Sequence, residues 1–365
     1  METTPSKRTL LKNSLLRCLI GQPLSWGYRT VTKLRNHLYD KDWIPSTSFP
    51  LPILCIGNLS LGGTGKTPHT EYLIHLLKEK YKTAVLSRGY KRKSQGFICA
   101  DKTSTTADIG DEPLQYFKKF DEEISIAVDE DRVHGIRALI QLVAPEVILL
   151  DDGFQHRCFR DNYNILLTEH DQLYCDDALL PLGTLREDKS NAKRADIIIV
   201  TKCSEQLDEK HQKEIIKKLR PEKTQHVFFS SIKYADTLQA KEKKFPLKEL
   251  EKMHILLVTG IAHAQPILDF LKSKVSKVIH LNYSDHHTFT TRNYLKIRNL
   301  FEKIPTSKII VTTEKDYMRM DLSQFKDLPV FYLPISIQIY KRKKFNEKIL
   351  YYVNTTQANH RISPK

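Results

Sequence analysis

The stretch Ser60-Leu61-Gly62-Gly63-Thr64-Gly65-Lys66-Thr67 decides the fold. It follows an apolar, β-branched run at Pro52–Gly57 and precedes a helical pattern at Glu71–Lys80, which is the strand, glycine turn and helix order of a phosphate-binding loop. Glycines let backbone N–H groups curl around phosphates, and the helix N-terminus adds the positive end of its dipole. Ser60 stands where the usual motif has glycine, so the stretch is interpreted as a variant loop.

Each residue of this loop is a candidate for nucleotide binding. Lys66 is expected to reach the β- and γ-phosphates, and the Thr67 hydroxyl to ligate Mg²⁺. ATP is the expected nucleotide rather than GTP, because Thr201-Lys202-Cys203-Ser204 lacks the aspartate that a T-K-x-D pattern would place at 204.

Around this loop the chain alternates short β-branched runs with longer helical or polar stretches. Besides Pro52–Gly57, the runs are Thr83–Ser87, Ile124–Val128, Glu146–Asp151, Asn164–Thr168, Asp196–Thr201, Val227–Ser230, His254–Gly260, Lys277–Leu281, Lys308–Thr313 and Val330–Leu333. Strands buried on both faces have this texture, and parallel sheets covered by helices produce it. The expected fold is therefore α/β, with a P-loop NTPase-like, mostly parallel sheet flanked by helices.

Three segments are expected along the chain. The charged stretch Lys241–Lys252, which contains Pro246, is the most plausible boundary between domains. This places a core with the phosphate-binding loop (P-loop) at residues 46–240 and a smaller α/β C-terminal domain at 241–365. Residues 1–45 form a basic amphipathic N-terminal helical segment.

That N-terminal segment is expected to be helical in two pieces, because proline at Gly21-Gln22-Pro23 interrupts the pattern. Apolar residues recur at helical spacing in both pieces, at Leu11, Leu15 and Leu19 and then at Leu24, Tyr28, Val31, Leu34 and Leu38. Residues 1–45 hold eight Lys or Arg and three acidic residues. This pattern is typical of a helix lying on an anionic membrane surface, and equally of an amphipathic helix packed on its own domain.

The overall charge narrows the classes of partner. The 365 residues are 40% hydrophobic and carry 58 Lys plus Arg against 43 Asp plus Glu, a formal net charge of +15. Such a surplus suits nucleic acid, an anionic membrane or a phosphorylated ligand. The charge is not accompanied by a nucleic-acid-binding signature, so nucleic acid is not an expected partner. The longest apolar runs fall short of the 18 residues of an ordinary transmembrane helix.

Acidic residues follow one of the apolar runs. Val147-Ile148-Leu149-Leu150 ends in Asp151-Asp152-Gly153, which is the Walker B arrangement of a strand running into carboxylates. Asp151 and Asp152 are thus candidate Mg²⁺ ligands, together with Thr67.

Two further clusters suit the phosphorylation of an alcohol. Asp111, in Gly110-Asp111-Glu112-Pro113, is either a helix cap or a general base. His286, in Asp285-His286-His287, is either structural or takes the hydroxyl proton. The basic run Arg88–Lys93 is either a solvated loop or a site for a phosphorylated acceptor.

Taken together, these motifs resemble the tetraacyldisaccharide 4′-kinase family, the lipid A 4′-kinases. The blocks that carry the resemblance, in chain order, are Gly57 to Pro68, Leu86 to Tyr90, Gly110 to Pro113, Leu150 to His156, Pro181 to Glu187, Asp285 to His287 and Thr313 to Asp316. In the block Pro181 to Glu187, Thr184 stands where the family usually has proline.

The resemblance implies transfer of the ATP γ-phosphate to the 4′-hydroxyl of an acylated glucosamine disaccharide 1-phosphate, giving lipid IVA. It implies that Asp111 and His286 handle the proton, that Arg186 helps bind the nucleotide and that Glu187 acts in catalysis. It also implies a peripheral location on the cytoplasmic face of the inner membrane. Kinases of soluble phosphorylated sugars or nucleosides, and P-loop ATPase or switch modules, are the alternatives.

Overall fold

The computed structural model describes residues 21–241, 243–305 and 307–362, which form two compact units. The first unit holds residues up to Ser87, Asp131–Ser231 and the segment from Ile339 onward. The second unit holds Arg88–Glu130 and Ile232–Gln338. The predicted first helical piece, with Leu11, Leu15 and Leu19, lies outside the described residues.

A parallel sheet forms the centre of the first unit. Its strand order is β8-β7-β6-β1-β5-β2, and each neighbouring pair is parallel. The bounds are β1 Ile53–Asn58, β2 Thr83–Ser87, β5 Val147–Asp151, β6 Tyr163–Glu169, β7 Ile197–Thr201 and β8 His226–Tyr234, whose last residues belong to the second unit. Every residue of β1, β2, β5 and β7 is buried, as the unbroken apolar runs predict.

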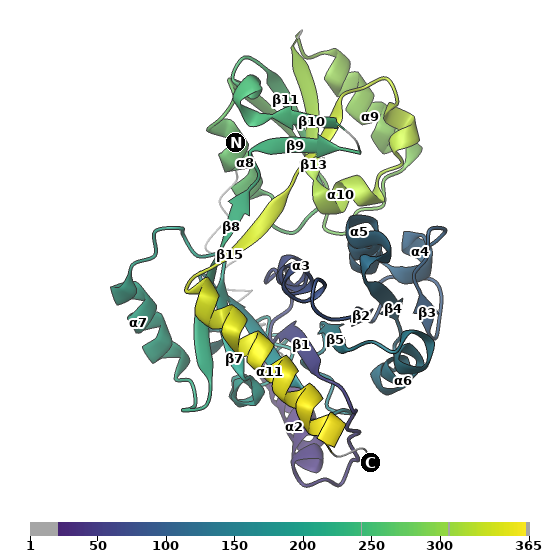
Figure 1. Cartoon of the computed structure of the whole chain (residues 1–365). Coiled ribbons are helices and arrows are strands. Elements are labelled where there is room, and N and C mark those ends of the chain that lie inside the picture. The colour runs from purple at the N-terminus through teal and green to yellow at the C-terminus, as the bar shows by residue number, and fades with distance from the viewer. Residues whose placement is uncertain (1–20, 242, 306, 363–365) are drawn as a thin grey trace. The chain divides into compact units, whose positions relative to one another are not determined.

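Helices surround this sheet (Figure 1), namely α3 Lys66–Leu77, α6 Arg132–Val143, α7 Glu209–Leu219 and α11 Arg342–Ile362. Helix α3 packs on β1 and β5, and α6 packs on β2. Helix α11 packs on α3 and β8 through Phe345, whose ring contacts the rings of Tyr72 of α3 and Phe228 of β8 edge to face. Short 3₁₀ turns η3 Tyr174–Asp176 and η4 Lys189–Arg194 connect β6 to β7. The expected P-loop NTPase-like α/β fold is confirmed.

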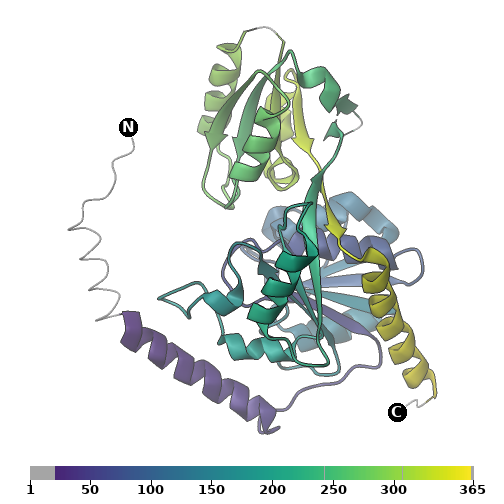
Figure 2. The same cartoon turned by 90° about the vertical axis from the view of Figure 1, so that its left-hand side faces the viewer.

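Helix α2, Gln22–Asp40, belongs to the first unit (Figure 2). It packs on that unit through a polar face. Its buried residues are Ser25, Thr32 and Asn36, and Asn36 Nδ2 donates to Asn191 Oδ1 at 3.1 Å. Two ion pairs hold the helix at its flanks, Arg29 to Asp188 at 2.8 Å and Arg35 to Glu187 at 2.7 Å.

The predicted apolar stripe of α2 lies only partly in that contact, since the Tyr28 hydroxyl donates to the carbonyl of Arg186 at 2.7 Å and Leu38 is half-buried. Leu24, Val31 and Leu34 are exposed. At about 100° per residue, these three side chains lie about 135° around the helix from the buried polar face. Leu24, Val31 and Leu34 therefore face away from the unit on which the helix packs.

The second unit is built on a six-stranded sheet of order β10-β9-β14-β13-β11-β12. Its strands are β9 Thr237–Ala240, β10 Lys243–Pro246, β11 His254–Thr259, β12 Lys277–Asn282, β13 Lys308–Thr313 and β14 Val330–Leu333. Strands β12, β11, β13 and β14 are parallel, whereas β9 runs antiparallel to both β10 and β14. The unit's helices are α8 Gln265–Lys272, α9 Thr291–Glu302 and α10 Glu314–Arg319, with 3₁₀ turns η5 Leu247–Leu250 and η6 Leu322–Phe325.

Residues 88–130 group with this second unit, which differs from the expected division at residue 240. They contain β3 Ile98–Cys99, α4 Thr106–Ile109, α5 Asp111–Phe120, η2 Asp121–Glu123 and β4 Ser125–Val128. The physical reason is that α5 packs against α10, about two hundred positions later in the chain. Strand β15, Ile335–Ile339, then leads back to the first unit, to which α11 belongs.

Among the described residues, the helices are all too short or too polar to cross a membrane.

Candidate functional site

The phosphate-binding loop lies between β1 and α3 in the first unit. Gly62 and Gly65 have φ angles of 117° and 89°, a left-handed conformation that residues with a Cβ rarely adopt. Helix α3 begins at Lys66, directly after Gly65, so the loop amides gather at a helix N-terminus. Ser60 is not among the described residues with positive φ, and its backbone pairs with Leu185 in an antiparallel bridge. The position that usually carries glycine therefore accepts serine here.

Two neighbouring segments hold this loop in place. Leu61 N–H donates to the carbonyl of Thr184 at 2.7 Å, and Arg186 N–H donates to the carbonyl of Leu59 at 2.7 Å. On the other side, the Thr201 hydroxyl at the end of β7 donates to the carbonyl of Thr64 at 2.9 Å. The predicted proximity of the Arg186 segment to the loop thus follows from backbone pairing.

The Walker B carboxylates lie at the same edge of the sheet as the loop. Because β1 and β5 are parallel and Ile56 pairs with Asp151, both strands end side by side. Lys66 Nζ lies 3.7 Å from Asp152 Oδ1. Arg186 donates two hydrogen bonds to the same carboxylate, from Nη2 to Oδ1 at 2.9 Å and from Nη1 to Oδ2 at 3.2 Å.

Charge compensation keeps Asp152 ionised. Burial alone would raise the pKa of this carboxyl, but the positive charges of Lys66 and Arg186 outweigh it and lower the pKa to about 2. Lys66 and Arg186 thus meet at the Asp152 carboxylate beside the loop, where an anionic phosphate would bind.

Asn58, the last residue of β1, is a site residue whose role sequence reasoning missed. Its amide nitrogen donates to the Thr64 hydroxyl at 3.0 Å, and its amide oxygen accepts from Arg186 at 2.5 Å. Lys66 Nζ lies 3.5 Å from the same oxygen. The available signal was an amide side chain at the end of an apolar strand, where the structure buries it fully.

Glu187, predicted to be catalytic, is not among these side chains. Its buried carboxylate contacts Arg35 of α2 at 2.7 Å and Arg194 of η4 at 2.5 Å. Burial raises its pKa, and the two arginines oppose that rise. These contacts favour a structural role, in which Glu187 fastens α2 and η4 to the segment that carries Arg186.

Asp111 and His286 are brought together within the second unit. Asp111 is the first residue of α5, and its Oδ2 lies 3.0 Å from His286 Nδ1. Gly110, just before it, has a φ of 88°, and a Cβ there would meet the carbonyl oxygen of Tyr90 at 3.0 Å, so glycine is needed. The aromatic ring of Tyr90 packs edge-on against the imidazole at 5.5 Å between centroids.

Cations of α10 surround this pair. Lys315 Nζ lies 2.7 Å from Glu112 and 3.4 Å from His286 Nε2, and Arg319 lies 3.4 Å from Asp111 Oδ2. Burial would raise the pKa of Asp111, but the hydrogen bond from His286 and the charges of Arg319 and Lys315 lower it overall. Asp111 is therefore an anion at neutral pH, hydrogen-bonded to an imidazole.

The basic run Arg88–Lys93 is only partly available to a ligand. Arg92 is paired with Glu130 and donates to the carbonyl of Gly96 at 2.7 Å. Lys91 lies over the ring of Tyr90 at 5.7 Å. Arg92 thus has a structural role, and an anion site in this run would use the remaining cations.

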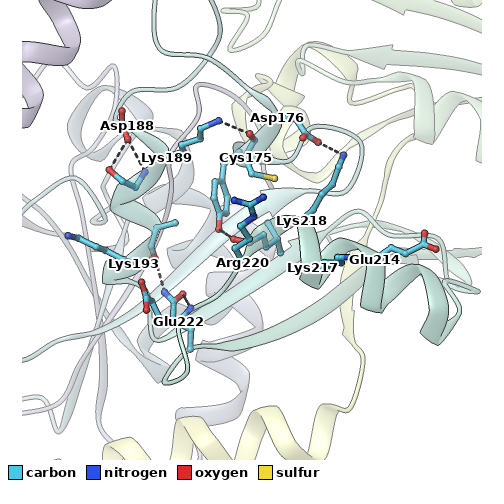
Figure 3. Close-up of a pocket in the computed structure, with 15 residues that line it drawn as sticks. Cys175, Asp176, Asp188, Lys189, Lys193, Glu214, Lys217, Lys218, Arg220 and Glu222 are labelled. Atoms are coloured by element: carbon cyan, nitrogen blue, oxygen red, sulfur yellow. Dashed lines mark hydrogen bonds and ion pairs between the residues drawn. The ribbon is translucent and has the colours of Figure 1, made fainter.

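A cavity of about 940 Å³ lies elsewhere in the first unit, between η3, η4 and the end of α7 (Figure 3). Some of its charged side chains are paired with one another or with the backbone. Lys189 donates to the carbonyl of Cys175 at 3.0 Å, and Lys218 lies 2.7 Å from Asp176. None of the residues proposed from the sequence as site residues lines it, so this cavity is separate from the phosphate-binding loop.

Comparison with known proteins agrees with this geometry. Residues 17–354 match the family model described as Tetraacyldisaccharide-1-P 4′-kinase. A tetraacyldisaccharide 4′-kinase of Bacteroides thetaiotaomicron is 43% identical, covering 94% of this chain and 95% of the relative. A tetraacyldisaccharide 4′-kinase of Flavobacterium johnsoniae is 44% identical, and the match covers 93% of this chain and 98% of the relative.

A solved structure agrees as well. The crystal structure of LpxK from Aquifex aeolicus in complex with ATP has a TM-score of 0.73 and 28% sequence identity, and the match covers 94% of this chain and 99% of that one. The resemblance expected from the motifs is confirmed. The chain belongs to the tetraacyldisaccharide-1-phosphate 4′-kinase family.

Proposed function

We propose that this protein transfers the γ-phosphoryl group of ATP to the 4′-hydroxyl of a tetraacylated glucosamine disaccharide 1-phosphate, giving lipid IVA. The observation that carries the proposal is the convergence of Lys66, Arg186 and Asp152 beside a glycine-rich loop at a helix N-terminus. Phosphoryl transfer depends on positioning and charge neutralisation, and these groups supply both. Family membership supports the choice of acceptor.

The loop and its neighbours would hold the nucleotide. The loop amides bind phosphate oxygens, and Lys66 neutralises charge on the group in transfer. Arg186 is fixed by Asn58 and Asp152, so it is pre-organised to do the same without reorganising during the reaction.

The residues beside the loop also fit Mg²⁺. Thr67, Asp151 and Asp152 offer a hydroxyl and carboxylates, the hard oxygen donors that this ion prefers. The described residues hold no group of three or more His, Cys, Asp or Glu side chains placed to bind a metal. That suits an ion held by one or two protein oxygens together with phosphates and water. When bound, Mg²⁺ would neutralise charge on the β- and γ-phosphates.

We assign the proton of the acceptor hydroxyl to the Asp111–His286 pair. Asp111 is kept ionised by Arg319 and Lys315, so it can accept the hydrogen on His286 Nδ1 and fix the tautomer of the ring. A carboxylate and imidazole in this contact can take up a proton as a unit.

The exposed stripe of α2 would dock on an anionic membrane. The helix is fastened to its own unit through polar residues, while Leu24, Val31 and Leu34 stay exposed. Lys33 and His37 are exposed on the same helix and suit an anionic leaflet. Insertion of this stripe would hold the enzyme at the surface that contains its acylated substrate, on the cytoplasmic face of the inner membrane.

The proposal is tested with γ-³²P-labelled ATP, Mg²⁺ and either micellar tetraacyldisaccharide 1-phosphate or soluble phosphorylated sugars. We expect label in the lipid and none in the soluble sugars, and loss of that label with Lys66→Ala. Label found only in soluble sugars would make the protein a kinase of small metabolites. Release of inorganic phosphate alone would make it an ATPase or switch.

A further inference from the structure

His69 lies one turn into α3 and is directed back at the phosphate-binding loop. Its side chain is only 3% exposed. Both ring nitrogens have partners, Nδ1 with the carbonyl oxygen of Gly65 at 2.7 Å and Nε2 with the hydroxyl oxygen of Ser230 at 3.0 Å. The nucleotide roles set out above do not use this residue.

These partners fix the tautomer of the ring. A carbonyl oxygen can only accept, so Nδ1 carries the hydrogen and donates it to Gly65. Nε2 then accepts from the Ser230 hydroxyl.

The anchored carbonyl belongs to the peptide that joins Gly65 to Lys66. In a planar trans peptide the C=O and N–H groups point in opposite directions. A bond that holds the Gly65 oxygen toward His69 therefore directs the Lys66 N–H away from the helix, to the side where the loop amides gather. The ordinary helical bond from His69 N–H to the same oxygen is long, at 3.3 Å, so the imidazole provides the shorter contact.

We propose that His69 is a positioning residue of the phosphate-binding loop, which anchors the Gly65 carbonyl so that the Lys66 N–H is presented to a nucleotide phosphate. The inference rests on the proposed nucleotide role of the loop. The rest of the loop has its own supports at Asn58 and Thr201. Loss of His69 should thus release this one peptide without collapsing the loop.

Asparagine and glutamine separate this role from simple packing. His69→Asn places an amide nitrogen at the δ position, where it can still donate to Gly65. His69→Gln moves the amide outward toward the ε position, and His69→Phe keeps the volume but removes the donor. Tyr72→Phe is the matched control, because it deletes a hydrogen bond of the same helix, to Asn346 at 2.7 Å, away from the loop.

The readouts are the KM for ATP, kcat and the increase in melting temperature caused by Mg²⁺ and ATP. We expect His69→Phe and His69→Gln to raise the KM for ATP about 10-fold and to reduce the ATP-dependent increase in melting temperature, the scale of one lost hydrogen bond in a buried site. His69→Asn should have a KM for ATP and an ATP-dependent increase in melting temperature close to those of wild type. Tyr72→Phe should match wild type in both quantities. If His69→Phe does not fold, the comparison of Asn with Gln decides. Equal ATP-dependent increases in melting temperature or equal KM values for those two variants, or a folded His69→Phe with wild-type values, would overturn the inference.

The ATP-dependent increase in melting temperature is measured without an acceptor, so it tests the inference even where the proposed function fails. Lys66→Ala should abolish the ATP-dependent increase in melting temperature. If Lys66→Ala abolishes this increase while the wild-type protein does not phosphorylate the lipid, the loop still binds ATP. The His69 variants then still test the inference. If Lys66→Ala leaves ATP binding unchanged, the role of the loop fails, and the inference fails with it.

Discussion

Replacing Leu24, Val31 and Leu34 of α2 by serine should release the protein from anionic vesicles. These side chains are 58%, 68% and 58% exposed. Full burial of such a side chain contributes about 1.5 to 3 kcal/mol, so the exposed fractions contribute about 1 to 2 kcal/mol each when they enter a membrane. The three together amount to about 3 to 5 kcal/mol, which predicts vesicle binding weakened at least about 100-fold.

The assay is co-sedimentation with vesicles that contain anionic phospholipid, over a range of lipid concentrations. A matched control is Leu142→Ser with Leu295→Ser, because these leucines of α6 and α9 are 60% and 56% exposed but lie outside the stripe. The melting temperature of the triple variant should stay within a few degrees of wild type, since α2 packs through its polar face. Unchanged vesicle binding, or a large loss of thermal stability, would refute the assignment of the stripe to the membrane.

Three further predictions concern the site. Lys66→Ala should lower turnover by at least about 10²-fold in a folded protein, because it removes a charge that acts on the group in transfer, and steady-state kinetics with a circular-dichroism control would check this. Asp111→Ala and His286→Ala should each lower kcat about 10²-fold or more, and the double variant should lose little beyond the worse single one; additive losses would mean separate roles. Lowering the pH from 6.5 to 4 should cost about 3 kcal/mol of unfolding free energy through His69, because the unfolded chain takes up a proton that the buried ring, with a pKa of about 4, does not. Urea denaturation at each pH measures the unfolding free energy. Its decrease between pH 6.5 and pH 4 should be smaller in His69→Asn than in wild type, and an equal decrease would contradict this role of His69.

Much of the fold could be predicted from local pattern. Each of the eleven apolar runs lies on an observed strand, because buried parallel strands leave a continuous β-branched signal. The missed strands are β3, β9, β10 and β15, which hold two to five residues each. Half-exposed short strands carry little apolar pattern, so sequence alone does not mark them.

The extent of the two units could not be predicted in the same way. Residues 88–130 belong with the second unit because α5 packs on α10, a contact between distant parts of the chain. For α2, the apolar spacing fitted both a packed helix and an exposed one. The structure shows a helix that buries Ser25, Thr32 and Asn36 against its own unit and leaves Leu24, Val31 and Leu34 exposed, and its binding to a membrane stays a prediction.

Residue type and motif order pointed to Lys66, Asp152 and Arg186, which meet in the first unit, and to Asp111 and His286, which meet in the second; their roles in the reaction stay predictions. Residues whose role comes from one tertiary contact could not be predicted from the sequence. Arg319 matters because it reaches Asp111, and Asn58 because it reaches Arg186 and Thr64. For Glu187 the resemblance implied catalysis, and the structure adds two contacts that the sequence did not show, with Arg35 and Arg194.

The most direct test is the position of the new phosphate on the product. The purified enzyme is incubated with ATP, Mg²⁺ and tetraacyldisaccharide 1-phosphate, and the lipid product is examined by ¹H–³¹P correlation NMR. We predict a second phosphate monoester whose phosphorus couples to the proton at carbon 4′. Coupling to a proton at any other carbon, or inorganic phosphate as the only new phosphorus species, would contradict the assignment of this protein as a 4′-kinase.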